Sequence, residues 1–588
     1  MYKAPLSDMK FALATLAADM PHLAQSLPDD EMIDVILTEA GKLASDVIAP
    51  LNHAADKSGG AVRKDDGQVQ TPEGFADAFS QLAEGGWTSM EAEEAFGGQN
   101  MPLALSSCVN EMWQASNMAF SLCHLLTQGL ISALQHSASE EQKAQFVPPM
   151  VEGRWTGTMN LTEPQAGTDL AAIKTKAVKQ GDHYLISGQK IYITYGEHDM
   201  AENIIHLVLA RTPDAPEGHR GISVFLVPKF LINDDGSLGK RNDVHCVSIE
   251  KKLGIKGSPT AVLQYGENGG AVGYLVGEEN QGLAIMFGMM NHARFNVGVQ
   301  GLALSDRALQ QALYYAETRV QGTPLGREAK SPIIHHPDVT RLLGQMKAES
   351  EAMRALMIYG AALLDESETQ GGDSKLRADF MIPVIKGWLT EQSLIMTSHN
   401  VQIHGGMGFI EETGAAQHYR DARILPIYEG TTAIQSNDLL FRKTVRDDGA
   451  QAKSLLQDIK KTALQGKAFD NQMIQQFAQD LDDMTVLAEQ AVDNLLSRQN
   501  QSREIAASGV PYLMMLGTLT AGWMLLKQGL FAADEQAKEG ADQAFLQNKL
   551  ASLMLFGALS LPQIAALAKT ISLAGDAVEH LSVKDWLS

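Results

Sequence analysis

Cysteine is scarce in this chain of 588 residues, which contains only Cys108, Cys123 and Cys246. The three form no CxxC pair and no zinc-ligand spacing, which argues against a disulfide framework and a cysteine-based metal site. We therefore expect three buried thiols in a reducing compartment and no bound metal.

Positive charge is also in short supply, because 47 basic residues stand against 70 acidic ones and the net charge is −23. A large nucleic-acid surface needs clustered positive charge, so this composition argues against a nucleic-acid partner. The first twelve residues carry Lys3, Asp8 and Lys10 and no long apolar run, which excludes a secretory signal there. We expect a cytoplasmic protein.

Charged residues are missing from positions 505–526, a stretch long enough to span a bilayer. Ser, Gly, Thr and Pro residues dilute its apolar character, so we expect a buried helix and no transmembrane segment. Several common motifs are absent too, including G-x-G-x-x-G, G-x-x-x-x-G-K-[ST], H-E-x-x-H and G-x-S-x-G. The S-x-x-K pattern at residues 187–190 lies in a strand-like stretch, which does not favour a nucleophile.

The pattern of apolar residues predicts four sections along the chain. Residues 1–155 are predicted to be helical, 156–279 to form a β domain, 280–445 to form a four-helix bundle, and 446–588 to form an additional helical domain. We expect helices over 33–47, 74–85, 103–114, 119–136, 140–151, 283–321, 336–364 and 378–402. Pro50 is expected to end the first of these. We expect strands over 173–178, 183–193, 203–210, 221–227 and 261–265, punctuated by Gly181, Gly188 and Pro228.

One carboxylate, Glu429, stands in an apolar stretch over residues 424–435. Pro426 and Gly430 predict a bend or an element boundary there. A carboxylate among these apolar neighbours would be poorly hydrated, so its pKa would rise and it would become a stronger base. The stretch alone also fits a glutamate at a helix start, stabilised by the helix dipole.

Three further stretches could contact a ligand. The sequence MNLTEPQAGTD (159–169) predicts a strand that runs into a turn with hydroxyls and free N–H groups, which suits an anionic cofactor edge or an ordinary structural turn. The sequence QKIYITYG (189–196) offers two tyrosine rings, and QIHGGMGF (402–409) is a glycine-rich turn where backbone could approach a ligand closely.

Together and in this order, these motifs resemble those of the acyl-CoA dehydrogenase family over about residues 30–445. The matching pieces are LTEPQAGTD, GQKIYITYG, KLGIKGSPT, LVGEENQGL, QIHGGMGF and IYEGTTAIQ. The resemblance implies a mainly α fold with a central β domain: a helical domain, a β-barrel and a four-helix bundle, here followed by an extra C-terminal helical domain. It also implies bound FAD and bundles that mediate oligomerisation.

The resemblance implies a role for each matching residue. Glu429 matches the catalytic base, which takes the α-proton of an acyl-CoA thioester while the β-hydrogen leaves as hydride to the flavin. The residue before Arg294 is Ala293, so the alternative base position of some family members is not filled. Expected FAD contacts are Leu161, Thr162, Gly167, Thr168, Tyr192, Thr194 and Thr431, with Arg319, Gln402, Gly405 and Gly406 reaching the FAD of a neighbouring subunit. Expected substrate contacts are Arg294, Thr168 and Gly430.

The chain departs from the family pattern at several places. Gln165 replaces a usual glycine, Gly322-Thr323 stands where many members have Phe-Gly, and about 140 residues follow Lys443. The extension resembles that of larger bacterial members, some of which act on 3-(methylthio)propanoyl-CoA and others on a broad range of acyl chains. The resemblance implies a trans-2-enoyl-CoA product, an electron-transfer flavoprotein as acceptor, and a dimer or tetramer.

Two alternatives remain open at this stage. An acyl-CoA oxidase would pass its electrons to molecular oxygen. A DNA-associated relative would need a basic C-terminal section, whereas residues 447–588 carry 11 basic and 17 acidic residues.

Overall fold

The computed structural model describes residues 2–582 and residue 586. By their internal contacts these residues form two compact units. Unit 1 comprises residue 2, Glu39–Pro102 and Met112–Asn296, and unit 2 comprises Lys3–Thr38, Leu103–Glu111 and the residues from Val297 onward. The four domains expected along the sequence stay a prediction about how the chain divides.

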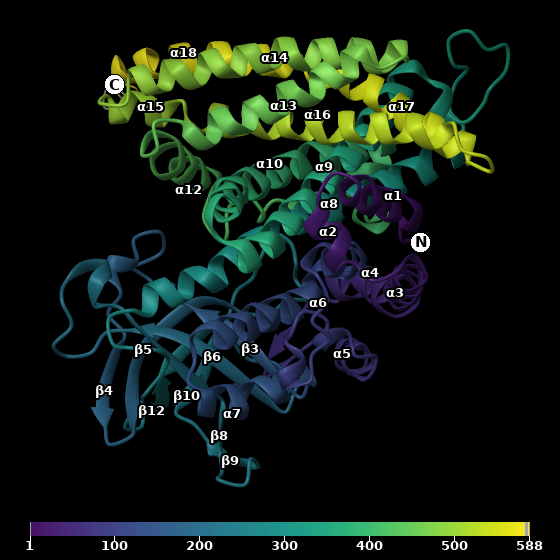
Figure 1. The fold of residues 1–588 in the computed structure, drawn as a ribbon. Coiled ribbons are helices and arrows are strands. Elements are labelled where there is room, and N and C mark those ends of the chain that lie inside the picture. Colours follow the sequence, from purple (N-terminus) through teal and green to yellow (C-terminus); the bar gives the residue numbers. More distant parts are fainter. Residues whose placement is uncertain (1, 583–585, 587–588) are drawn as a thin grey trace. The chain divides into compact units, whose positions relative to one another are not determined.

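Unit 1 is built around a curled eight-stranded sheet with the order β10-β11-β5-β12-β7-β6-β3, and β4 pairs with β5 (Figure 1). Its strands are β3 (Trp155–Asn160), β4 (Lys176–Gln180), β5 (His183–Thr194), β6 (Asn203–Ala210), β7 (Ser223–Pro228), β10 (Val244–Ile249), β11 (Thr260–Tyr265) and β12 (Ala271–Leu275). Two small antiparallel pairs accompany it: β1 (Val62–Arg63) with β2 (Val69–Gln70), and β8 (Phe230–Ile232) with β9 (Leu238–Arg241).

Most pairs in this sheet are antiparallel, but β3 runs parallel to β6 along its whole length. Every residue of β3, β6 and β7 is buried, so these strands are covered on both faces. One core cluster joins β3, β6 and β7 to α6 (Leu103–Ser137), α7 (Glu140–Val151) and the start of α8 (Gly282–Thr318). This core fixes where β3 ends, and the turn that carries the LTEPQAGTD motif begins there.

The other helices of unit 1 are α4 (Ala49–Lys57) and α5 (Phe75–Glu84), while α3 (Asp30–Leu43) crosses the boundary between the units. The α7 helix begins with a capping box, in which Ser139 accepts from the N–H of Gln142 and the Gln142 side chain accepts from the N–H of Ser139.

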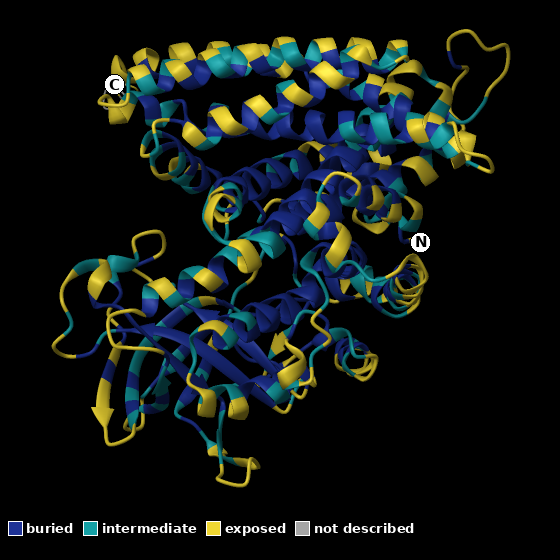
Figure 2. Ribbon diagram, viewed as in Figure 1, coloured by how far each residue is buried: buried dark blue, intermediate teal, exposed yellow. Residues whose placement is uncertain are grey.

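Unit 2 is a helical assembly that includes the C-terminal section. Its helices are α1 (Leu6–Ala17), α2 (Pro21–Ser26), α9 (Pro337–Gln370), α10 (Gly372–His404), α11 (Ala415–Ala422), α12 (Thr432–Asn437), α13 (Ala450–Ala468), α14 (Gln472–Ser497), α15 (Ser502–Ala507), α16 (Gly509–Gln536), α17 (Gln543–Leu559) and α18 (Gln563–Glu579), with most of α8. Figure 2 shows exposed residues along the outer sides of α13 and α14, whereas α9 and α10 are largely buried.

Buried charges also join the helices of unit 2. Arg354 on α9 contacts Glu111 on α6 at 2.6 Å and Asp306 on α8 at 3.0 Å. Lys549 on α17 forms ion pairs with Asp8 on α1 and with Glu351 on α9. The C-terminal section therefore forms one compact unit with the bundle.

The structure corrects several boundaries expected from the sequence. Pro50 does not end a helix, because it lies in the first turn of α4, which continues directly from a π-helical segment, Ala44–Ile48. The two helices expected over 103–114 and 119–136 are confirmed, because non-helical backbone at Asn117 (φ −159°, ψ 91°) separates two helical stretches within α6. Gly188 lies inside β5, as the strand expected over 183–193 requires, and its φ of +150° lets the strand pass close to Thr175. Among the described residues, seven strands lie outside the expected strand ranges, namely β1, β2, β3, β8, β9, β10 and β12. Of these, only the end of β3 was expected, as the strand that runs into the turn of residues 159–169.

Two helical segments are long and apolar enough to cross a membrane: α16, and Gln543–Glu579, which contains α17 and α18. In α16, 83% of the most apolar window is buried inside the protein, as expected for a core helix. The second segment is interrupted by a turn between Leu559 and Gln563, and each of its two helices has 17 residues, fewer than the ~20 that a span needs.

Candidate active site

The residues that the sequence predicts for the site fall into two sets, one in each unit. The first set lies in unit 1, in the turn after β3 and at the end of β5. The second set lies in unit 2, around Glu429 and at the ends of α8 and α10.

The turn after β3 is anchored by a buried ion pair. Glu163 receives hydrogen bonds from Lys190 Nζ at 2.9 Å, from the Thr175 hydroxyl at 2.6 Å, and from the N–H groups of Thr175 and Lys174. Lys190 also donates to Leu161 O at 2.9 Å. These bonds fix the path of the chain through the LTEPQAGTD motif.

The electrostatics of this pair reflect its burial. Burial would raise the pKa of Glu163, but the Lys190 ammonium and the hydrogen bonds outweigh it and lower the pKa to about 2. Burial lowers the pKa of Lys190 to about 8, although Glu163 opposes this change. Both groups are therefore charged at neutral pH.

Three threonine hydroxyls in unit 1 are available to a polar ligand. Within the described part of the chain, the side chains of Thr162, Thr168 and Thr194 make no hydrogen bond. Gly167 is exposed, and a methyl group placed on its α-carbon would meet nothing within 4 Å. This open turn with unpaired hydroxyls fits the edge of a large polar cofactor.

Tyr192 is the most unusual residue of the first set. Its φ is +60°, a conformation that non-glycine residues rarely adopt, and its side chain is 61% exposed. The strain costs of order 1 kcal/mol and persists only where the surroundings enforce it. Leu161 is buried close by, since Ile191 N–H donates to Thr162 O at 2.9 Å. A flat ring held in solvent beside open hydroxyls suits contact with an aromatic cofactor.

In unit 2, Glu429 lies in the turn between α11 and α12, as its neighbours Pro426 and Gly430 predict. Its own φ is +55°, so it is strained like Tyr192. Thr431 caps α12 by accepting from Ile434 N–H at 3.3 Å, and so Glu429 stands outside the helix. Glu429 is half-buried, but Ile427 is exposed and does not enclose it. The raised pKa expected for Glu429 stays a prediction.

Several groups hold the Glu429 turn. Lys386 on α10 donates to Leu425 O at 2.8 Å and to Gly430 O at 2.7 Å. The Gln435 amide donates to Glu429 O at 3.1 Å, and the Tyr428 hydroxyl donates to Gln300. The carboxylate thus stands on a rigid piece of backbone.

The glycine-rich turn at the end of α10 is open. Gln402, Gly405 and Gly406 are exposed, and a methyl group on either glycine would meet nothing within 4 Å. Arg319 is exposed just after α8, where its backbone pairs with Tyr315 and Ile333. The ring of Tyr315 stacks on His404 at 4.1 Å, which ties the end of α8 to the end of α10. These two segments present a guanidinium, an amide and open backbone on one region of unit 2.

Arg294 lies in the part of α8 that belongs to unit 1. It is half-buried, and its guanidinium donates to Asn291 at 3.5 Å. Its preceding residue, Ala293, is 2% exposed and has no titratable group, which leaves Glu429 as the one residue that the family motifs offer as a base.

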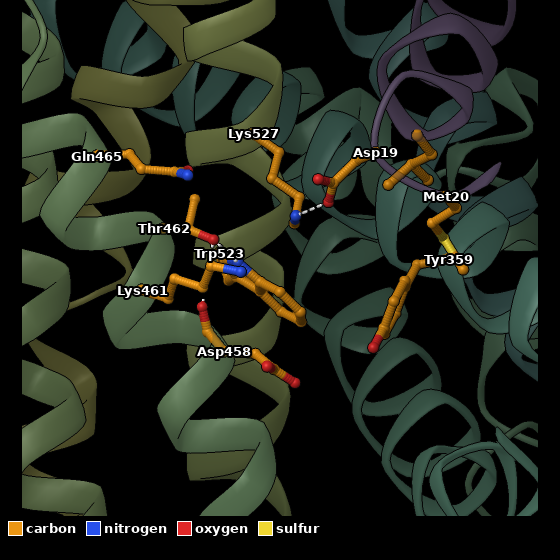
Figure 3. A pocket seen from close by; sticks show the side chains of 10 residues that line it. Asp19, Met20, Tyr359, Asp458, Lys461, Thr462, Gln465, Trp523 and Lys527 are labelled. Atoms are coloured by element: carbon orange, nitrogen blue, oxygen red, sulfur yellow. Dashed lines mark hydrogen bonds and ion pairs between the residues drawn. The ribbon is translucent and has the colours of Figure 1, made fainter. Parts of the chain in front are cut away.

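Unit 2 also contains a cavity of about 210 Å³ (Figure 3). It is lined by Leu16, Asp19, Met20, Tyr359, Asp458, Lys461, Thr462, Gln465, Trp523 and Lys527. Two pairs of its polar side chains contact each other: Lys527 with Asp19, and Trp523 Nε1 with the Thr462 hydroxyl at 2.8 Å. None of the predicted site residues lines this cavity, so it is not part of the predicted active site.

Sequence reasoning missed the residues that support the site. Glu163 lies within the LTEPQAGTD motif and was given no role of its own, but it anchors the turn. Lys386 stands alone in the apolar run FMIPVIKGWL, and an isolated lysine in a buried helix face was the signal that could have revealed it.

Comparison with known proteins identifies the family of this chain and its fold. Consecutive family models match the chain: the N-terminal domain of acyl-CoA dehydrogenases over residues 34–154, the middle domain over 158–267, and the C-terminal domain over 280–442. A fourth, described as acetyl-CoA dehydrogenase C-terminal like, matches residues 455–582. The chain belongs to the acyl-CoA dehydrogenase family, whose members are FAD-dependent oxidoreductases acting on a CH–CH group.

Among its relatives is a 3-methylmercaptopropionyl-CoA dehydrogenase from Ruegeria pomeroyi, 45% identical over 98% of this chain and 99% of the relative. Another is a broad-specificity linear acyl-CoA dehydrogenase from Mycobacterium tuberculosis, 35% identical over 91% of each chain. A solved acyl-CoA dehydrogenase from Bacillus anthracis, complexed with FAD, has the same fold, with a TM-score of 0.73 and 21% identity over 92% of this chain and 88% of its own.

Proposed function

We propose that Glu429 is the catalytic base of an acyl-CoA dehydrogenation that yields a trans-2-enoyl-CoA. The observation that carries this proposal is the strained, rigidly supported turn that presents a half-buried carboxylate outside any helix. A general base must reach the proton that it removes, and a fixed backbone keeps it within reach. Gly430 and Arg294 are the residues of this chain that would contact the substrate, together with Thr168.

FAD fits the residues described above and supplies the hydride acceptor when it is bound. In unit 1 it would be held by Thr162, Thr168 and Thr194, whose hydroxyls are unpaired within residues 2–582, and by Leu161, Gly167 and Tyr192. In unit 2, Thr431 would contribute next to the base. The Glu429 carboxylate accepts the α-proton, and the family resemblance assigns its backbone N–H to the thioester oxygen, where negative charge develops.

We further propose that 3-(methylthio)propanoyl-CoA is a substrate. The 45% identity to a dehydrogenase of that thioester, over nearly the whole of both chains, supports this choice. The relative with broad specificity for linear acyl chains supports the second candidate, a general fatty acyl-CoA dehydrogenase.

Initial rates of dye reduction over a range of acyl-CoA concentrations test the substrate. The matched comparison is pentanoyl-CoA, which has a methylene where the methylthio compound has sulfur and is otherwise the same length. A specific enzyme gives a higher kcat/KM for the sulfur compound than for pentanoyl-CoA, whereas similar values from butanoyl- to octanoyl-CoA identify the broad-range enzyme. Failure with every acyl-CoA contradicts both.

An electron-transfer flavoprotein is the proposed electron acceptor, and the family resemblance supports it. The alternative, an oxidase, produces hydrogen peroxide in proportion to the enoyl product. Peroxide formation under air with no dependence on an added flavoprotein acceptor would exclude the dehydrogenase assignment. We also propose a cytoplasmic location, which sedimentation of the native protein with the membrane fraction would contradict.

A second copy of this chain is the proposed partner of unit 2. Large apolar side chains are exposed on the segments joined by the Tyr315–His404 stack; they are Tyr314, Val320, Met407, Phe409 and Ile410. Phe409 is 85% exposed, and such a concentration of exposed apolar groups marks an interaction surface. Arg319, Gln402, Gly405 and Gly406 lie on the same segments, so this partner would bring them to the neighbouring FAD.

Light scattering of Phe409→Asp tests the oligomer. A charge at the centre of this surface is expected to lower the molar mass from a multiple of 63.6 kDa to the monomer value and to weaken FAD retention. Leu464→Asp is the matched control, because Leu464 is also exposed but lies on α13. A wild-type protein that is already a monomer with full FAD occupancy would contradict the proposal.

A further inference from the structure

Lys386 is buried in α10 with no exposed surface. An ammonium removed from water is costly unless polar partners replace the lost hydration. The sequence neighbours of Lys386 on α10, Ile385 and Gly387, are buried too and have no polar side chain. Polar partners for the ammonium come from outside α10. Its partners include two backbone carbonyls, Leu425 O and Gly430 O, at 2.8 and 2.7 Å.

These two carbonyls bracket Glu429 in the sequence. Leu425 lies four residues before the proposed base, and Gly430 follows it directly. A single ammonium that holds both carbonyls fixes the distance between the two ends of the turn. Charge-assisted hydrogen bonds of this kind are about twice as strong as neutral ones, so the fixed distance resists deformation.

The conformation of Glu429 requires such support. A φ of +55° at a residue with a side chain costs of order 1 kcal/mol and persists only when the surroundings enforce it. The Gln435 amide holds Glu429 O, and Lys386 holds the next carbonyl, Gly430 O. Two consecutive carbonyls are therefore fixed from two elements, α10 and α12, and the direction of the Glu429 side chain follows from them.

A second lysine ties the same region to α10. Pro383 lies inside α10 and has no N–H to give to Asp379 O, one turn earlier. The Lys443 ammonium donates to that carbonyl instead. Two lysines therefore connect α10 to the segment that carries Glu429. Of these two, Lys386 is the one that binds a carbonyl directly beside the base, Gly430 O.

We propose that Lys386 is a positioning residue that holds the Glu429 backbone in its left-handed conformation and so aims the carboxylate at the α-proton. This inference rests on the proposed role of Glu429 as the base. Lys386 acts through the turn and touches neither the substrate nor the cofactor in this proposal. Misplacing a reacting group by about 1 Å can lower a rate by ~10²-fold, which sets the size of the effect.

Single-turnover reduction of the bound flavin by acyl-CoA, without oxygen, provides the test. Lys386→Met keeps a chain of similar length and removes the ammonium. We expect flavin reduction to slow by at least ~10-fold, while FAD occupancy and the dissociation constant for acyl-CoA stay within about twofold of wild type. Lys549→Met is the matched control: Lys549 is also buried in unit 2 but contacts Asp8 and Glu351, so it should lower thermal stability without slowing flavin reduction.

A double-variant comparison separates positioning from general damage. In a Glu429→Gln background there is no base to aim, so adding Lys386→Met should slow the residual reaction by less than about twofold. An equal loss in both backgrounds, or no loss in the single variant, overturns the proposal. If Lys386→Met does not fold, Gln435→Met removes the other tie, at Glu429 O, and must show the same dependence on Glu429.

The outcomes also distinguish this inference from the function that underlies it. A wild-type enzyme that no acyl-CoA reduces would refute the proposed reaction, and a Glu429→Gln variant as fast as wild type would refute the base. The positioning role alone is refuted if Glu429→Gln slows flavin reduction but both Lys386→Met and Gln435→Met keep the wild-type rate, or if Lys386→Met causes an equal loss with and without Glu429.

Discussion

Replacing Glu163 by Gln tests whether the buried ion pair in unit 1 holds the turn that would receive the flavin. Lowering the pKa of Glu163 from 4.5 to about 2 corresponds to about 3 kcal/mol of stability at pH 7. Burial lowers the pKa of Lys190 to about 8, so the cost of burying its ammonium opposes this gain at pH 7. Because each of the two pKa values already contains the attraction between Glu163 and Lys190, their energies do not add, and the cost of burying two charges leaves the pair little net stability, as is usual for buried ion pairs.

Removing only one charge of the Glu163–Lys190 pair costs more stability than removing both. Glu163→Gln leaves the Lys190 ammonium buried beside a neutral amide, which is expected to cost ~3–5 kcal/mol. For a unit of this size, such a loss lowers the thermal midpoint by at least ~6 °C. The turn also loses its charged acceptor for Thr175 and Lys174, so FAD occupancy, measured from the visible absorbance, should fall.

The pH dependence has a defined sign. The contribution of Glu163 is present above pH 4.5 and disappears as the pH falls toward 2, because its pKa is lowered on folding. The cost of Lys190 is present below pH 8 and disappears as the pH rises to 10.5. In Glu163→Gln the pKa of Lys190 should fall below 8, so the loss of thermal stability relative to wild type should shrink as the pH rises toward 8 and stay constant above it.

Calorimetry with a second variant completes this test. Glu163→Gln/Lys190→Met removes both charges and should recover much of the lost midpoint, because no buried ion remains unpaired. A Glu163→Gln protein with the wild-type midpoint and full FAD occupancy would show that the ion pair does not hold the turn, and the reasoning above would fail.

Two further predictions concern buried charges in unit 2. Burial raises the pKa of Glu349 to about 7 although the Ser560 hydroxyl donates to it at 2.5 Å. Stability from this raised pKa is full below pH 4.5 and is lost as the pH rises to 7, so Glu349→Gln should raise the thermal midpoint at pH 7.5 and leave it unchanged at pH 4.5; equal midpoints at pH 7.5 would contradict this. Arg354→Met leaves Glu111 and Asp306 buried without their cation and should cost ~3–5 kcal/mol, seen as a lower midpoint in calorimetry, whereas a wild-type midpoint would show that the cluster relaxes freely.

Most of the fold follows from local patterns in the sequence. The long helices α7 to α10 were predicted to within a few residues because their apolar positions recur at helical spacing. Strand β3 was expected only at its end, although all of its residues are buried, because a short buried strand shows no alternation of polar and apolar residues. The break at Asn117 agrees with the two helices expected over 103–114 and 119–136.

The candidate site also contains residues that the sequence predicts and residues that it does not. Glu429 and its turn could be predicted because Pro426 and Gly430 mark the bend and the surrounding motif matches a family. The supporting residues could not, because Lys386 lies 43 positions before Glu429 and Lys190 lies 27 positions after Glu163 in the sequence. Such contacts form only when the chain folds. Their one sign in the sequence is a charged residue within an apolar run.

Single-turnover flavin reduction by Glu429→Gln tests the assignment of the base most directly. Gln keeps the size of Glu and the backbone N–H, but it cannot accept a proton, so the protein should fold, retain FAD and bind acyl-CoA. Glu412→Gln is the matched control, because Glu412 is exposed and lies outside the turn. We expect Glu429→Gln to slow flavin reduction by at least ~10²–10⁴-fold, the usual effect of losing a general base, and Glu412→Gln to leave it unchanged. Flavin reduction by Glu429→Gln at the wild-type rate would contradict the proposed mechanism.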